Sequence, residues 1–587
     1  MRALGRGFPN AGNSSGASHS VEDMTELADR VERLAQEFAE SGATSGTLRM
    51  HHSQWSNGID PSYVVGTDRV HQVSGRRELA HAVRSELGVD MDGVVEMRLR
   101  LSGDSYEFQY QCTPGSSERY WDAARRLVLD HDYRYPGRQQ PVAAVDTVPD
   151  NRPTDPAVLA TVRELVRGYI DVYTAAHSRA PELAAGAAEG DIAAAEARIG
   201  LRLPEDLRAL YRLVGYDHDD RGVLGITRLS PLSDVAATHL SDSPTVMGLS
   251  ADSRSVGDDS LFTDDQVVSE GWPHGTIQRV SRSAGWVFIG TSDRNAHGVD
   301  LDPGPTGRRG QLIEIGLGYD SATRWAVSVT EALQKSIESQ RARENFGSLY
   351  DTAQPAHARR LHDPGETIDD LPDKFAVQKL DLRSSDSFDA AELSALPMLR
   401  QLRVDGIRTL NLAVPQDIPL ESLWVSGPHF DLEPLSGHPV LWDVHLAGAQ
   451  HPVRLAPLAA LKNLQRLDIS EIDAADPEIV AELANLRVLV ANRQQWRRLR
   501  ELDAVPAHLA AAELAGDASF AEEAAWADTF GRGAEFAELP VIRGALGEVR
   551  VRPQPESEDS AARIADVMAD VPWNLLLQLR REPESGA

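Results

Sequence analysis

One short phrase recurs seven times in the last third of this chain: an aliphatic residue, two spacers, a second aliphatic residue, one spacer and a third aliphatic residue. The copies begin at Val377, Leu399, Leu420, Leu441, Leu464, Leu486 and Leu509. The steps between them are 22, 21, 21, 23, 22 and 23 residues. This period is typical of a solenoid in which each unit supplies one strand and one return segment. We therefore expect a stacked sheet with a broad face for another macromolecule.

The repeats resemble a leucine-rich-repeat array over about 375–515. In a strand, successive side chains point to opposite faces, so the fourth and sixth positions of each phrase point inward and the fifth faces the concave side. The fifth positions are Asp381, Arg403, Trp424, His445, Asp468 and Val490. An exposed tryptophan beside a histidine and charged residues is typical of a contact hot spot. The candidate protein-binding residues are therefore Trp424, His445, Arg403, Asp381 and Asp468.

Two observations qualify this interpretation of the repeats. A single exposed aromatic residue needs no functional explanation, so Trp424 is alternatively a surface aromatic in a degenerate repeat. The resembled family usually places asparagine after each strand, whereas this chain has other residues there. They are Ser385, Ile407, Pro428, Ala449, Ile472 and Gln494. We therefore expect irregular curvature.

Length and composition bound the remaining possibilities. A chain of 587 residues, 41% of them apolar, is expected to form three or four domains. Its single cysteine, Cys112, excludes an intramolecular disulfide. We find no leader and no apolar run that would cross a bilayer, so we expect a cytoplasmic protein. The net charge of -30 argues against nucleic-acid binding and favours a basic partner, although acidity is also common among soluble proteins.

We predict an α+β multidomain protein: an N-terminal α+β domain, a central α+β domain and a C-terminal solenoid. Residues 1–20 are predicted to be a disordered lead-in, followed by an α+β domain at 21–137 and a linker at 138–155. A middle domain with a preceding helix spans 156–340, and a second linker spans 341–373. The repeats fill 374–516, and 517–587 form a C-terminal cap and tail.

The middle domain contains the most distinctive phrases of the chain. The segment from Gly190 to Gly215, GDIAAAEARIGLRLPEDLRALYRLVG, predicts two short helices, with Asp191 as an N-cap, Gly200 ending the first and Pro204 opening the second. Strand-like WVFIG and QLIEI follow, separated by the turn-rich VDLDPGPTGRRG. These phrases, over about 190–337, resemble the SUKH superfamily, which includes cell-wall assembly regulators and bacterial immunity proteins. The resemblance implies binding of protein partners without catalysis.

The first domain has a weaker likeness. Alternating residues predict a β-hairpin turning at Ser102, Gly103 and Asp104, and a helix is expected from about Ser117 through Val128. With the closing HDYRYPG, residues 21–137 resemble YezG-like immunity proteins, although the tryptophan-led strand of that family is missing.

The search for catalytic motifs yields no enzyme prediction. The chain has no Gly-Lys pair for a P-loop and no paired-histidine zinc helix. The serine-elbow spelling Gly12–Gly16 lies in the polar lead-in, without flanking strand or helix. We predict no catalytic residue, no cofactor and no metal.

The predicted function is that of a non-enzymatic immunity protein, which neutralises a basic toxin or toxin domain of a bacterial polymorphic toxin system by direct contact. The alternative is an intracellular scaffold or regulatory adaptor of the cell-wall-regulator type that binds endogenous proteins. A third possibility is an enzyme in the N-terminal domain, using Glu107, His131 and Asp132. Nucleic acid and membrane are not expected partners. The sequence leaves the oligomeric state, the partner's identity and the decisive module open.

Overall fold

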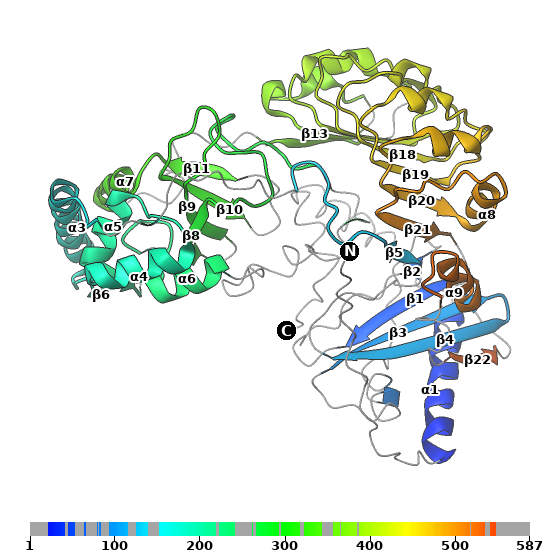
Figure 1. The fold of residues 1–587 in the computed structure, drawn as a ribbon, viewed down its shortest axis with the longest axis horizontal. Helices are drawn as coiled ribbons and strands as arrows, with labels where there is room; N and C mark the ends of the chain where they lie inside the picture. Colours follow the sequence, from blue (N-terminus) through cyan, green and yellow to red (C-terminus); the bar gives the residue numbers. More distant parts are fainter. Residues whose placement is uncertain are drawn as a thin grey trace, which may run out of the picture. The chain divides into compact units, whose positions relative to one another are not determined.

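A computed structural model gives the structure of the chain (Figure 1). It describes residues 21–40, 45–52, 64–65, 79, 82–83, 93–114, 125–138, 149, 152–218, 222–240, 261, 266–292, 295–316, 322–342, 356–363, 365–383, 387–516, 518–533 and 541–546. The predicted lead-in, most of the predicted helix from Ser117 and most of the predicted tail lie outside these residues. The chain forms two compact units, 1–127 with 514–587, and 128–513. Helices, strands and several sheets together make an α+β multidomain protein.

The first unit is built around an antiparallel sheet of order β2-β1-β3-β4-β22. Its elements are α1 (Val21–Glu40), β1 (Ser45–His52), β2 (Val64–Val65), β3 (Gly93–Ser102), β4 (Ser105–Pro114), α9 (Phe520–Asp528) and β22 (Val541–Ala545). The predicted hairpin is confirmed: Ser102 pairs with Ser105, and Gly103 takes a φ of 56° in the turn between them. One face of the sheet buries Leu99 and Phe108 against α1.

The C-terminal part of the chain completes this unit. Strand β22 pairs antiparallel with β4, and Arg543 contacts Glu107 at 3.0 Å. Arg98, on β3, pairs with the buried Glu523 of α9 at 2.9 Å and lies over the Phe520 ring. The sequence does not predict this contribution, because strand pairing between segments more than 400 residues apart leaves no local periodicity.

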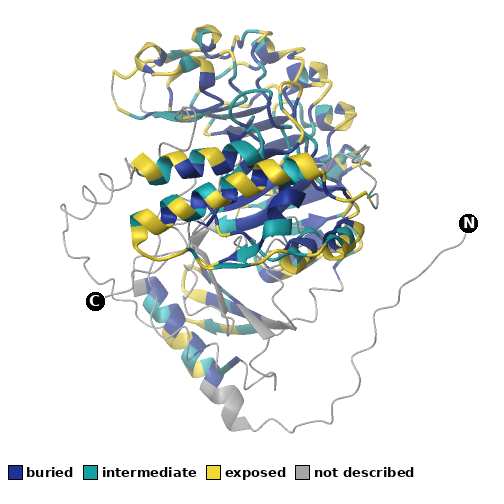
Figure 2. Ribbon diagram, turned by 90° about the vertical axis from the view of Figure 1, so that its left-hand side faces the viewer, coloured by how far each residue is buried: buried dark blue, intermediate teal, exposed yellow. Residues whose placement is uncertain are grey.

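In the second unit, residues 152–342 form a helix-and-sheet domain. It contains α3 (Pro156–His177), β6 (Leu183–Ala185), α4 (Glu189–Ile199), α5 (Glu205–Leu213), β7 (Val214–Asp217), α6 (Leu232–Leu240), β8 (Trp286–Ser292), β9 (Asn295–Asp300), β10 (Gln311–Gly316), β11 (Thr323–Ala326) and α7 (Val329–Ala342). Strands β8 to β11 form an antiparallel sheet in sequence order, and β6 pairs with β7. The helices turn one side to the shared core and the other to solvent (Figure 2).

The helix ends of this domain correct two predictions. Helix α4 begins at Glu189, and Asp191 lies within its first turn, where its carboxylate accepts the Ala188 N–H at 3.1 Å. Pro204 precedes α5 as its N-cap and is not its first helical residue. Gly200 ends α4 as predicted, with a φ of 79°, which glycine adopts without a steric penalty.

The second unit also contains the repeat array, a largely parallel stack. Its strands are β12 (Ala358–Leu361), β13 (Lys379–Arg383), β15 (Gln401–Asp405), β17 (Ser422–Ser426), β18 (Asp443–Ala447), β19 (Arg466–Glu471), β20 (Val488–Asn492) and β21 (Ala511–Ala515), with β5 (Arg126–Val128) next in the sheet. Leu127 and Val128 therefore belong to a strand, which corrects the helix predicted there. Strand β12 lies in the predicted linker 341–373.

The segments between the strands are mostly 3-10 turns. They are η5 (Ile368–Asp370), η6 (Lys374–Ala376), η7 (Ala390–Ala395), η8 (Glu433–Leu435), η9 (Ala456–Ala460) and η10 (Pro477–Glu482), with one α-helix, α8 (Arg493–Glu501), and a small parallel pair, β14 (Ser387–Asp389) and β16 (Thr409–Asn411). All twelve fourth- and sixth-position residues from Leu380 to Ala491 are buried, which confirms the predicted inward positions.

A glutamine partly replaces the missing asparagines. The side-chain amide of Gln495 donates to the carbonyls of Ile469 at 2.6 Å and Ile472 at 2.8 Å. Asn492 caps α8 and donates to the carbonyl of Ser470 at 2.9 Å. These bonds satisfy the turn that follows β19, where buried carbonyl groups need donors.

Candidate protein-binding surface

The five candidate residues lie side by side on neighbouring strands. Asp381 pairs in register with Arg403, Arg403 with Trp424, Trp424 with His445, and His445 with Asp468. Each of the five residues lies between two inward-pointing neighbours. All five side chains therefore share the face of the sheet that is opposite the buried aliphatic residues. We call these five residues and Arg360, which pairs with Asp381, the ladder.

The sequence does not predict Arg360 as a ladder member. The register places Arg359 opposite Leu380, at the fourth position of the phrase, where the later repeats carry an aliphatic residue. The repeat signal therefore fails at the first strand, although Leu361 at the sixth position is buried like its counterparts.

Trp424 is the centre of an internal stack. The guanidinium carbon of Arg403 lies 3.1 Å from the centroid of the indole ring, and the His445 ring centroid lies 4.5 Å away on the neighbouring strand. Trp424 is only partly exposed, which corrects the prediction of an exposed tryptophan. The stack fixes the orientation of the ring before any partner arrives, and this reduces the entropy lost on binding.

Both aspartates of the ladder are buried and paired. Asp468 lies 3.0 Å from Nδ1 of His445, and Asp381 accepts two contacts from Arg383, at 3.1 and 3.2 Å. Burial raises the pKa of each carboxyl, but the neighbouring histidine and arginine groups outweigh it and hold both pKa values below the ordinary range. The two carboxylates therefore support the basic side chains beside them.

A second row of residues lies just before each strand, at the second position of the phrase. We call this row the edge ladder; its members are Gln378, Arg400, Glu421, Trp442, Gln465 and Arg487. The chain itself covers it from two directions.

The segment 129–138 covers one part of the edge ladder. The Tyr135 ring stacks on Trp442 at 5.1 Å, the Tyr133 hydroxyl donates to Gln465 at 2.8 Å, and Asp130 pairs with Arg487. The N–H groups of Leu129 and Asp130 both donate to the carbonyl of Ala510. The sequence predicts neither the segment's position nor its partners, because the contacts are made by an irregular stretch.

The segment 266–281 covers the other part of the edge ladder, which contains Gln378, Arg400 and Glu421. Gln378 accepts the Glu270 N–H at 2.6 Å and donates to the Glu270 carbonyl at 3.1 Å, while Arg279 pairs with Glu421 at 2.9 Å. Glu421 also accepts from Arg400 at 2.8 Å and from the Trp442 indole at 3.1 Å. The edge ladder is therefore an internal contact, and the ladder remains the candidate surface for a partner.

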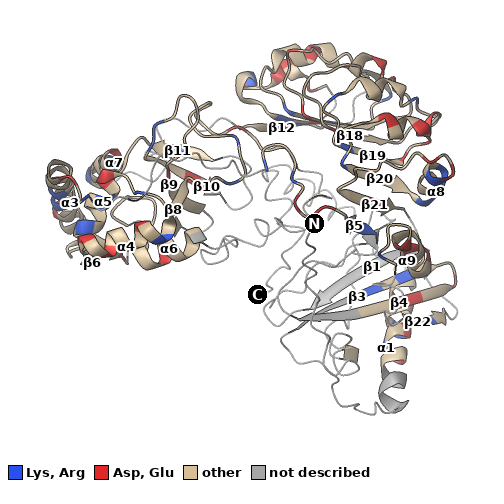
Figure 3. Cartoon of the chain, in the orientation of Figure 1, with Lys and Arg blue, Asp and Glu red and all other residues tan. Residues whose placement is uncertain are grey.

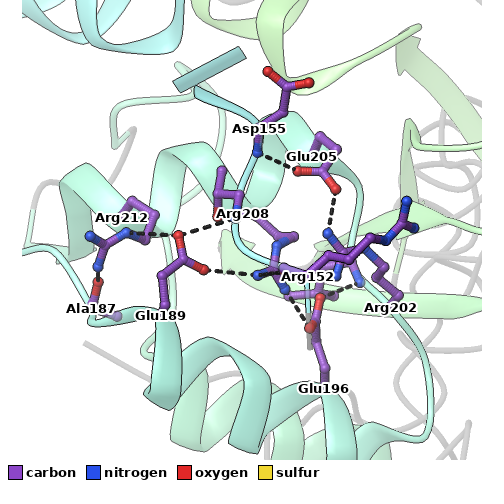
Figure 4. A network of polar contacts seen from close by, with 11 residues as sticks. Arg152, Asp155, Ala187, Glu189, Glu196, Arg202, Glu205, Arg208 and Arg212 are labelled. Atoms are coloured by element: carbon purple, nitrogen blue, oxygen red, sulfur yellow. Dashed lines mark hydrogen bonds and ion pairs between the residues drawn. The ribbon is translucent and has the colours of Figure 1, made fainter. Parts of the chain in front are cut away.

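In the middle domain, the distinctive helical phrase contains a buried ion-pair network (Figure 4). Arg208 and Glu196 pair with almost no exposed surface, and the second nitrogen of the Arg208 guanidinium reaches Glu189 at 2.9 Å. Glu196 also accepts the Leu203 N–H at 2.8 Å. Burial raises the pKa of Glu189, but bonds from Thr154 and the charges of Arg208 and Arg212 lower it overall. The network joins α4 to α5.

The turn-rich phrase holds a second buried acid, Asp300. Burial raises its pKa to about 6, despite hydrogen bonds from the Asp302 N–H at 2.9 Å and the Gln311 amide at 2.8 Å. The bonds orient the carboxyl at the end of β9, and the effect of burial exceeds theirs.

We expect this carboxyl to make the middle domain less stable as the pH rises. The pKa of Asp300 is about 6 in the folded domain and 3.8 in the unfolded chain, so the folded domain holds this proton to a higher pH. The stability that the proton contributes is therefore fully present below pH 3.8 and is lost as the pH rises through 6. The loss is at most about 3 kcal/mol. Urea denaturation should show the stability advantage of the native chain over Asp300→Asn shrinking across this interval. A difference that stays constant across this interval would contradict the assignment.

Comparison with known families identifies the middle domain. Residues 186–335 match the SMI1 / KNR4 family (SUKH-1), which confirms the resemblance predicted there. No curated protein matches the chain.

Two solved structures from Listeria monocytogenes show partial similarity. An internalin (inlF) is 24% identical with a TM-score of 0.18, over 20% of this chain and 35% of its own. An internalin C2 is 21% identical with a TM-score of 0.15, over 20% of this chain and 50% of its own. This chain thus spans half or less of the length of either internalin.

Proposed function

We propose that this chain is a non-enzymatic protein-binding protein of the immunity type, which neutralises a cognate toxin of a bacterial polymorphic toxin system by direct contact. The SUKH-1 match of residues 186–335 is the observation that carries the proposal. The alternative is an adaptor that uses the same surfaces to join endogenous proteins. No helix among the described residues is long and apolar enough to span a membrane.

The repeat array supports a binding role through its pre-ordered surface. Its ladder presents Trp424, held between Arg403 and His445, on the face opposite the buried aliphatic residues. Aromatic and arginine side chains dominate the binding energy of many protein interfaces. In the proposed mechanism, the middle domain and the ladder together cover the toxin's active cleft, and the net charge of -30 accelerates encounter with a basic toxin.

Affinity capture from the native cell tests the proposal. The tagged chain is expected to retain a toxin. Cells that express this toxin should stop growing, and co-expression of the chain should restore their growth. Trp424→Ala and His445→Ala are each expected to weaken retention about tenfold, because each removes one layer of the stack. Arg498→Ala, at an exposed position on α8, serves as the control. Failure to retain or neutralise any toxin would reject the immunity role, and retention of a non-toxic endogenous protein would favour the adaptor.

A further inference from the structure

We propose that the ladder face binds an acidic, extended segment of the protein partner. This inference rests on the proposed function, since it names the chemistry of the partner surface that the array would contact. The local charge of the first strands differs from the charge of the whole chain. Basic and acidic residues are interspersed along the array, so the net charge of -30 does not describe each face (Figure 3).

On strands β12, β13 and β15, the side chains facing outward are mainly basic. Arg360 is partly exposed, and the side chains of Arg383 and Arg403 keep 38% and 22% of their surface exposed. Asp381, beneath Arg383, is only 6% exposed, so its charge is directed to Arg383 and His362. Among these strand positions, Asp405 is the partly exposed acid, at 34%. A partner therefore meets three arginines and one aspartate.

The next strands add an aromatic surface, and the exposed acid among the residues of β17, β18 and β19 is Glu471, at the end of β19. Trp424 follows Arg403 in the ladder, and Asp443 and Asp468 are buried against Arg466 and His445. Arginine side chains recognise carboxylates through paired, directional hydrogen bonds, and a flat guanidinium beside an indole is already oriented for such bonds. The local chemistry thus fits glutamate and aspartate side chains presented along an extended backbone.

The charge of the rest of the chain favours an acidic protein segment over a nucleic acid. A long polyanion extends well beyond the three arginines and meets the field of a chain with a net charge of -30. A short acidic segment confines its charges within about one Debye length, roughly 8 Å at physiological salt, where the local arginines dominate. A toxin that is basic overall is compatible with this surface, because long-range steering and local docking involve different groups.

Binding of short peptides to the full-length chain tests the inference. A polyglutamate peptide is expected to bind at low salt, with affinity falling as salt rises, and a polylysine peptide of equal length is not. Arg403→Gln should weaken polyglutamate binding about tenfold, whereas Asp405→Asn should strengthen it severalfold, because the two substitutions change the local charge in opposite directions. Arg498→Gln, on α8 and paired with Glu501 at 3.5 Å, should leave the affinity unchanged.

Several results would overturn the inference. The inference is wrong if all variants bind polyglutamate with equal affinity. It is also wrong if the chain prefers polylysine, or if it binds a single-stranded oligonucleotide more tightly than polyglutamate. Thermal melting of each variant confirms that it folds before binding is measured. Toxin retention that survives Arg403→Gln but fails in Trp424→Ala would preserve the proposed function and reject the acidic contact. Charge-dependent polyglutamate binding in a chain that captures no toxin would support the contact and reject the immunity role.

Discussion

Arg208→Leu is expected to lower the free energy of unfolding of the SUKH-1 domain by about 3–5 kcal/mol. Arg208 is 1% exposed and pairs with Glu196, which is completely buried. Leucine would leave the Glu196 carboxylate with the hydrogen bond from the Leu203 N–H, at 2.8 Å, and without its arginine partner. A buried charge without its counter-charge loses hydration that a backbone donor does not replace. Hydrogen exchange of the amides in α4 and α5 measures the loss in the full-length chain.

Two further variants separate the ion pair from other effects. Glu196→Leu combined with Arg208→Leu removes both charges and should recover much of the loss, because no uncompensated ion remains. Arg167→Leu breaks the exposed pair with Glu164, at 2.8 Å, and is expected to cost less than about 1 kcal/mol. A loss below about 1 kcal/mol for Arg208→Leu itself would show that the network does not hold α4 against α5.

Local periodicity was sufficient to predict the parts of the fold that depend on neighbouring residues. The inward positions of the repeats, the Gly103 hairpin and the helix end at Gly200 follow from spacing and backbone preference, and all are present. The ladder residues other than Arg360 were predictable for the same reason, since a regular repeat places equal positions side by side. Their exposure was not predictable, because it depends on pairing partners such as Arg383 and on the stack around Trp424.

Contacts between distant segments gave no comparable signal. Tyr135 lies about 300 residues from Trp442 in the sequence. No periodic pattern in the sequence relates one residue to the other, so their contact could not be predicted. The pairing of β22 with β4 depends in the same way on backbone groups, which any residue except proline supplies. The ion pair of Glu196 and Arg208 was hidden within a phrase whose charged residues are compatible with an exposed helix face.

Trp442→Ala is expected to release the segment 129–138 from the repeat array. The Trp442 side chain is 3% exposed, donates to Glu421 at 3.1 Å and stacks on Tyr135. Truncation of a buried tryptophan costs about 3–5 kcal/mol, because apolar contact is lost and a cavity remains. It also removes the ring on which Tyr135 stacks and leaves the edge contact with Tyr133 as its aromatic contact. Hydrogen exchange should therefore show lost protection across 129–138, and trypsin should cleave faster after Arg134 and Arg138.

Trp424→Ala is the matched control, because it makes the same change on the adjacent repeat, at a partly exposed position on the ladder. It is expected to leave the protection of 129–138 unchanged while weakening partner retention. Trp442→Ala should show the opposite pattern: a large loss of protection in 129–138 and a smaller loss of partner retention. The reason is that the edge ladder contacts the chain's own residues. If 129–138 stays protected in Trp442→Ala, the hydrogen bonds to Ala510 and Gln465 suffice to hold it, and the aromatic stack is not the anchor.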